Sequence, residues 1–256
     1  MNLHDLSVIG TPALLATTVA VFILAGVVKG VVGLGLPTIS MAMLALVMAP
    51  AQAAALLIVP SLITNLWQAR PWPTLMQVLR RTGSLQAGVC VGTIAGALWL
   101  GAPAGHWASV CLGVALVLYA AWGLFGKPPT VPAQREGALG AVVGLATGVV
   151  TAATGVFVIP AVPYLQALRL DKDGLIQAMG ISFTVSTVAL AAGLWLNGSY
   201  TPDAAGASVL MLLPALAGMA LGQWLRDRLS PRAFKQCFMV SLALLGAYQV
   251  AQGLAG

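Results

Sequence analysis

The sequence predicts an all-α polytopic membrane protein built from two inverted structural repeats, each a broken or hairpin helix followed by three transmembrane helices. Composition is the first reason, since 59% of the 256 residues are hydrophobic and 7% are charged, whereas soluble domains carry about 25% charged residues. The second reason is a set of about eight apolar segments, each near the roughly 20 residues that a membrane-spanning helix needs. The third is a pair of interruptions rich in glycine and proline, about half a chain apart, as in duplicated membrane folds with discontinuous helices.

The expected elements follow along the chain. Residues 12–32 form a first apolar segment, which an interruption separates from a second helical piece at 37–48. A second interruption lies within 137–168. We expect the remaining spans at 52–69, 83–101, 106–126, 174–196 and 201–225, and a final span that follows a basic loop at 226–232 and ends at about 252. A short interfacial helix is expected at 71–81, before the second of these spans.

One linker-like segment, residues 127–136, is rich in proline and charged at both ends. It predicts a first membrane repeat over residues 1–126 and a second membrane repeat over residues 137–256. Residue identity between the two halves is weak, so this division rests on the matching order of the segments and their interruptions.

The distribution of cations indicates the topology. Eleven of the twelve Lys and Arg residues lie in loops. If each interrupted segment were one kinked crossing, these cations would divide evenly between the two sides, against the positive-inside rule. If each is a hairpin, all of them lie on one side and both termini lie on the other. Residues 12–48 as one helix would also extend about 55 Å, well beyond a hydrocarbon core of about 30 Å. We therefore favour hairpins, with kinked full spans as the alternative.

Lys29 stands directly before the first interruption and is the only charged residue between Asp5 and Arg70. Ionisable residues inside a membrane are costly and usually functional. Glycine and proline break the helix, and the freed backbone N–H groups must line a cavity or be buried in protein. A cation beside such groups predicts an anion site. The alternative is a lysine whose head group snorkels to the interface.

Small polar residues gather near both interruptions, and their hydroxyl and amide groups can donate to an oxyanion. For any single residue, hydrogen bonding between helices is an equal alternative. The predicted substrate-binding residues are Lys29, Gly33, Gly35, Pro37, Thr38, Asn65, Thr154, Gly155, Thr184 and Ser186. The wider polar set of the same stretches also contains Ser40, Ser61 and Thr187.

Several functional classes lack their chemistry in this sequence. All six acidic residues lie in the N-terminal tail or in loops, which leaves no intramembrane carboxylate pair for acid–base catalysis and no buried acid for a proton relay. Cys90, Cys111 and Cys237 have no metal-ligand spacing. We expect no enzyme activity, no cofactor and no metal. The net charge of +6 reflects the basic loops, so nucleic acid is not an expected partner.

The two interruptions carry a resemblance to a known family. Lys29-Gly30-Val31-Val32-Gly33-Leu34-Gly35-Leu36-Pro37 and Thr154-Gly155-Val156-Phe157-Val158-Ile159-Pro160-Ala161-Val162-Pro163-Tyr164-Leu165 resemble motifs of the sulfite exporter TauE/SafE family of bacterial inner-membrane anion transporters. The resemblance covers nearly the whole chain. Many members have a glycine triplet where this chain has Val156-Phe157-Val158.

The resemblance implies a multi-pass protein of the bacterial inner membrane that acts as a secondary transporter. Its expected activity is export of small sulfur-containing or organic anions such as sulfite or sulfonates. The expected partners are a small anionic substrate and the lipid bilayer, with a homodimer as an open assembly. A passive anion channel and a non-transporting structural membrane protein remain the alternative functions.

Overall fold

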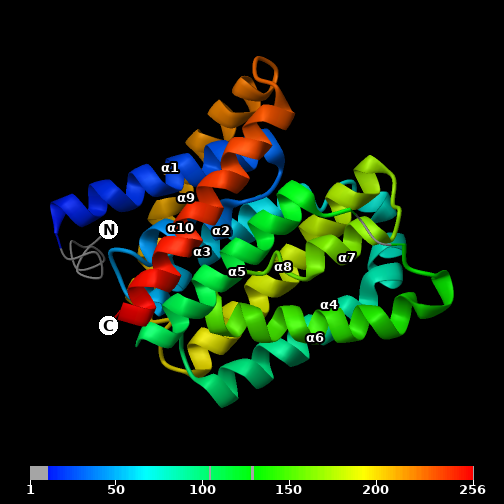
Figure 1. The fold of residues 1–256 in the computed structure, drawn as a ribbon, viewed down its shortest axis with the longest axis horizontal. Helices are drawn as coiled ribbons and strands as arrows, with labels where there is room; N and C mark the ends of the chain where they lie inside the picture. The colour runs from blue at the N-terminus through cyan, green and yellow to red at the C-terminus, as the bar shows by residue number, and fades with distance from the viewer. Residues whose placement is uncertain (1–10, 104, 128–129, 256) are drawn as a thin grey trace.

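The structure, a computed structural model, describes residues 11–103, 105–127 and 130–255, and these residues form ten α-helices and no strand (Figure 1). Eight of the helices are long and apolar enough to cross a membrane, which confirms the predicted all-α multi-pass fold. The helices are α1 (Pro12–Val32), α2 (Leu36–Leu44), α3 (Pro50–Gln68), α4 (Trp72–Leu100), α5 (Gly105–Phe125), α6 (Glu136–Thr154), α7 (Ala161–Ala167), α8 (Lys172–Leu196), α9 (Pro202–Arg226) and α10 (Pro231–Ala255).

Local sequence explains both ends of α1. The Thr11 hydroxyl accepts a hydrogen bond from the Leu14 N–H, and proline occupies the first helical position, where its missing N–H costs nothing. The helix ends at Gly33, whose φ of 78° is left-handed. Glycine adopts this conformation without steric strain, so the chain turns there. Helix α2 follows after two further residues.

The expected interfacial helix at 71–81 is wrong as a separate element. The structure has one continuous helix, α4, of 29 residues. Thr82 fits into it because its hydroxyl donates to the Val78 carbonyl at 2.9 Å, and a single glycine at position 83 does not end a helix. At 1.5 Å per residue α4 is about 43 Å long, so its first turns extend beyond the hydrocarbon core.

Two seams of glycine hold neighbouring helices at close backbone distance. In the first seam, α1 packs on α9: a Cβ atom added to Gly26 would lie 2.3 Å from the Ala215 carbonyl oxygen, and one added to Gly222 would lie 2.2 Å from the Val27 carbonyl oxygen. In the second seam, α4 packs on α6 through Gly88, Gly92, Gly144 and Gly148. Residue numbers rise together along both seams, so each pair of helices is parallel.

These directions show that the first interrupted segment is a hairpin. Helix α3 is antiparallel to α8, because Asn65 contacts Thr187 while Gln68 contacts Ile176. Helix α9 reverses direction after α8, so α3, α9 and α1 all run the same way. The chain must therefore return between residues 33 and 49. In Figure 1 the turn between α2 and α3 lies at the same end of the molecule as the beginning of α1.

The second interrupted segment returns in the same manner. Helix α4 is parallel to α8, because Gln86 donates to Ser182 and the Asn197 amide donates to the Ala97 carbonyl. Helix α6 is parallel to α4 and hence to α8, so residues 155–171 form a hairpin. The kinked full-span alternative is wrong for both segments.

The hairpins place the loop cations together. In Figure 1 the turns α3–α4, α5–α6 and α7–α8 lie at the right and the α9–α10 turn lies at the top, all away from the beginning of α1 and the end of α10 at the left. This distribution agrees with the positive-inside rule. We call the end that carries these turns the cation-rich face.

The halves also exchange partners, since α1 of the first half packs on α9 of the second while α6 of the second packs on α4 of the first. An inverted duplication predicts such an exchange. The two inverted repeats, with boundaries at residues 126 and 137, stay a prediction that this packing supports.

Candidate functional site

The first break leaves donors unpaired. Gly33 and Gly35 both have positive φ, 78° and 109°, and no side chain caps α2. The first bond of the α2 turn runs from the Ile39 N–H to the Gly35 carbonyl at 2.8 Å. The N–H groups of Leu36 and Thr38 precede that bond and so have no helical acceptor, and Pro37 has no N–H.

The second break is built differently. Gly155 has a φ of 69° and donates to the Thr151 carbonyl, as Gly33 donates to that of Lys29. The Thr154 hydroxyl accepts from the Val156 N–H at 3.1 Å and donates to the Val150 carbonyl. The expectation of free donors here therefore fails for Val156. The following side chains Val156, Phe157 and Val158 are fully buried.

The two breaks meet inside the bundle. Gly155 lies against Met41 of α2, so closely that an added Cβ atom would be 2.9 Å from the Met41 sulfur. Met41 itself is fully buried. The second break therefore contacts α2, the helix that follows the first break.

Lys29 is buried, with 5% of its surface exposed. Its Nζ donates to the side-chain oxygen of Asn65. The Asn65 amide nitrogen contacts the Thr187 hydroxyl at 3.4 Å, and that hydroxyl donates to the Phe183 carbonyl at 2.6 Å. The ammonium therefore belongs to a buried polar chain that joins α1, α3 and α8, and it does not snorkel to water.

No described carboxylate balances this ammonium. The one ion pair within the described residues joins Arg81 to Glu136. The acidic residues that the structure describes lie at helix ends, namely Glu136, Asp171, Asp173, Asp203 and Asp227. A buried charge without a counter-ion is costly, and Lys29 has no carboxylate partner among the described residues.

Several hydroxyls near the first break are buried without a protein partner in the described residues. Thr38 and Ser40 lie on α2 and Ser61 lies on α3, all fully buried. An unsatisfied buried polar group costs about 1–3 kcal/mol. These groups become satisfied if a ligand or water reaches them.

The two predicted site residues on α8, Ser186 and Thr184, differ in burial. Ser186 is 1% exposed and precedes Thr187, whereas Thr184 is partly exposed and donates to the Gly180 carbonyl of its own helix. The contact with Asn65 is made by Thr187, which was not among the ranked site residues. The sequence contains a signal for this contact. Asn65 and Thr187 are 122 residues apart, the same separation as Gly33 and Gly155, so the two residues occupy matching positions after the two breaks.

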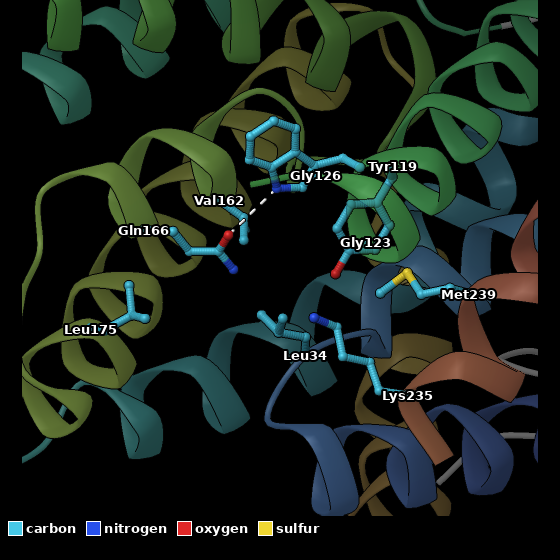
Figure 2. Close-up of a pocket in the computed structure, with 10 residues that line it drawn as sticks. Leu34, Tyr119, Gly123, Gly126, Val162, Gln166, Leu175, Lys235 and Met239 are labelled. Carbon is cyan, nitrogen blue, oxygen red and sulfur yellow. Dashed lines mark hydrogen bonds between the residues drawn. The ribbon is translucent and has the colours of Figure 1, made fainter. Parts of the chain in front are cut away.

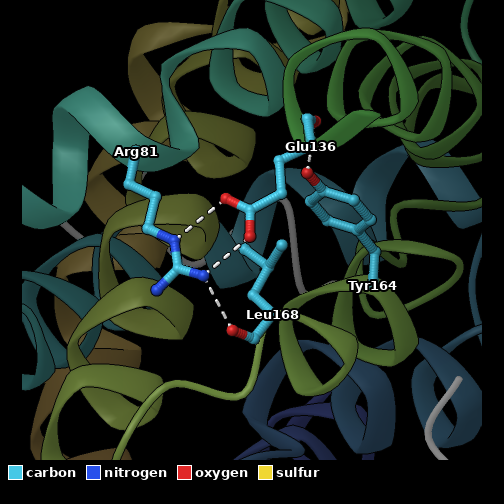
Figure 3. Close-up of polar contacts among 4 residues, drawn as sticks. All are labelled: Arg81, Glu136, Tyr164 and Leu168. Carbon is cyan, nitrogen blue, oxygen red and sulfur yellow. Dashed lines mark hydrogen bonds and ion pairs between the residues drawn. The ribbon is translucent and has the colours of Figure 1, made fainter. Parts of the chain in front are cut away.

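A second polar cluster ties the halves together at the cation-rich face. Figure 3 shows Arg81 of α4 donating to both carboxylate oxygens of Glu136, at 3.0 and 2.7 Å, and to the Leu168 carbonyl at 2.8 Å. The Tyr164 hydroxyl of α7 donates to the Glu136 carbonyl at 2.6 Å. These bonds join the first half of α4 to the first residue of α6 and to Leu168, the residue that follows α7.

We expect Arg81→Met and Glu136→Gln each to lower the melting temperature by about 2–4 °C, because a two-point ion pair at a partly exposed site contributes about 1 kcal/mol. A double-mutant cycle by thermal melting of the purified protein measures the coupling. Arg80→Met, which removes the neighbouring exposed arginine, serves as the control and leaves the melting temperature unchanged. Additive effects of the two substitutions would contradict the pairing.

Comparison with known proteins agrees with this geometry. A family model for the sulfite exporter TauE/SafE matches residues 18–249, a range that contains both breaks and the Lys29–Asn65–Thr187 chain. Comparisons with curated proteins and with solved structures returned no match. The matched family is one of transporters, in keeping with the eight apolar helices. The chain therefore belongs to the sulfite exporter TauE/SafE family.

Proposed function

We propose that this protein is a secondary transporter that exports small sulfur-containing anions, such as sulfite or sulfonates, across the bacterial inner membrane. The observation that carries the proposal is Lys29, a buried cation with no carboxylate partner among the described residues. A small oxyanion supplies the missing negative charge. The family match supports the same class of substrate.

The surroundings of Lys29 suit an oxyanion. Such a ligand accepts several hydrogen bonds at once, and charge-assisted bonds are the stronger ones. Beside the first break, the N–H groups of Leu36 and Thr38 have no acceptor within the helix. The hydroxyls of Thr38 and Ser40 have no partner among the described residues. Asn65 orients the ammonium through its amide oxygen. We assign Lys29 as the electrostatic anchor and α2 as the source of the donors.

The buried position of Lys29 indicates an occluded state, which requires a conformational change to admit the anion. The two breaks meet at Met41 and Gly155, and discontinuous helices of this kind allow one half to rock against the other. We propose that access alternates in this way, with the cation-rich face toward the cytoplasm. A homodimer stays a prediction.

Flux into liposomes tests the proposal against both alternatives. For the purified protein in liposomes we expect sulfite uptake that saturates with concentration, and thermal stabilisation of the protein by the same anion. A passive channel predicts a rate that rises linearly with the gradient. A structural membrane protein predicts neither flux nor stabilisation. A panel of sulfite, sulfoacetate, sulfate and acetate ranks the substrates.

A further inference from the structure

A cavity of about 390 Å³ opens beside the first break, between α5, α7 and α10 (Figure 2). Ligand pockets occupy about 300–1,000 Å³, so it has room for a small anion with water. Its principal lining residues are Leu34, Tyr119, Trp122, Gln166, Lys235 and Met239. Leu34 lies between the two glycines of the break, so one wall of the cavity is the break itself.

Tyr119 lines this cavity, and its hydroxyl lies buried just behind the cavity wall. The residue is 2% exposed, and its hydroxyl has no hydrogen-bond partner in the described part of the chain. Figure 2 shows the hydroxyl directed into the space between α5 and α10. A buried phenol normally finds a partner. The Tyr119 hydroxyl oxygen has less than 1 Å² of accessible surface, so a ligand in the cavity reaches it once a neighbouring side chain of the wall shifts.

Two further donors face the same space. The Gln166 side-chain oxygen accepts from the Trp122 indole N–H at 3.4 Å, which turns the Gln166 amide nitrogen toward the cavity in Figure 2. The Lys235 ammonium also points inward from α10. No acidic residue is among the described residues that line the cavity. Donors and positive charge are therefore in excess, and the ligand they suit is an anion.

We propose that this cavity is a second anion site, distinct from Lys29, in which Lys235, Tyr119 and Gln166 hold a small oxyanion next to the first break. This inference rests on the proposed function: the transported anion binds at this second site on its way between the cation-rich face and the buried Lys29. A phosphate of an anionic lipid offers the same chemistry as a free oxyanion, so the experiment separates the two sources.

The binding test uses full-length Lys29→Met protein, which removes the buried anchor. In nanodiscs of phosphatidylcholine, titration with sulfite under anaerobic conditions is expected to show binding at one site. Adding Tyr119→Phe and Lys235→Gln weakens this binding at least about tenfold, because a charge-assisted bond and a hydroxyl donor are lost. The control is Lys172→Gln, an exposed cation outside the cavity lining, which leaves the affinity unchanged.

The lipid arm repeats the comparison with phosphatidylglycerol in the nanodiscs and no sulfite. Retention of this lipid that depends on Tyr119 and Lys235 identifies the oxyanion as a headgroup phosphate. Equal sulfite affinity and equal lipid retention with and without the two substitutions overturn the inference. If the wild-type protein carries no sulfite across liposomes yet the cavity binds it, the proposed function fails while the second site stands.

Discussion

Replacing Lys29 by methionine is expected to reduce sulfite flux at least about 100-fold while the protein stays folded in the membrane. The substitution keeps an unbranched side chain, one atom shorter, and removes the only charge of the buried chain Lys29–Asn65–Thr187. An anion then meets a desolvated site with no counter-charge, which costs several kcal/mol. Uptake into liposomes at equal protein density measures the effect, and wild-type flux from this variant would contradict the assignment.

Stability separates a functional lysine from a structural one. We expect Lys29→Met to leave the melting temperature equal or higher, because a buried charge without a described carboxylate is replaced by an apolar side chain. We expect Asn65→Leu to lower the melting temperature instead. It removes the oxygen that accepts from Lys29, which reduces the free energy of unfolding by about 1–3 kcal/mol. If Lys29→Met were as destabilising as Asn65→Leu, the lysine would serve the fold and not the transport.

The second large effect is expected at the glycine seams. In Gly218→Ala the new Cβ atom would lie 2.1 Å from the Ile23 carbonyl oxygen, which belongs to backbone and cannot rotate away. Helices α1 and α9 must separate, which costs about 1–3 kcal/mol or more. Gly144→Ala should cost a similar amount, because its Cβ atom would lie 2.2 Å from the Leu85 carbonyl oxygen of the other seam.

Gly83→Ala is the matched control for these variants. It lies in α4, as the seam residues Gly88 and Gly92 do, yet a Cβ atom there meets nothing within 4 Å. Alanine is the better helix former, so we expect a gain of about 0.5–1 kcal/mol. Thermal melting and the yield of monodisperse protein measure all three variants. Equal stability of Gly218→Ala and Gly83→Ala would show that the α1–α9 contact is not close packed.

Predictions that rested on local chemistry were confirmed. Gly33 ends α1 because a left-handed residue stops a helix wherever the chain goes next. The positions of the loop cations along the chain predict the two hairpins. The directions of α1 and α3 in the structure agree with the first of them. Local signals fail near Thr82: proline and arginine near the start of α4 predict a separate short helix, whereas the structure has one continuous helix.

The contacts among the predicted site residues follow from the sequence only in part, and the site itself stays a prediction. Lys29 and Asn65 were identified and are in contact, because a lone charge and an amide inside apolar sequence are conspicuous. Thr184 and Ser186 were ranked above Thr187, which makes the contact. One residue along an α-helix turns the side chain by about 100°, and three residues move it about 4.5 Å along the axis. Sequence alone does not decide such a choice.

The sequence by itself determined the membrane class, the number of spans, the two breaks and the isolated lysine, because these depend on apolar run length, on backbone chemistry and on the scarcity of charge. Only the tertiary structure decided which polar groups meet, which hydroxyls remain unpaired and where the cavity beside Leu34 lies. Those contacts join helices far apart in the chain. Their register is set by the glycine seams, where carbonyl oxygens lie within about van der Waals distance of a neighbouring backbone.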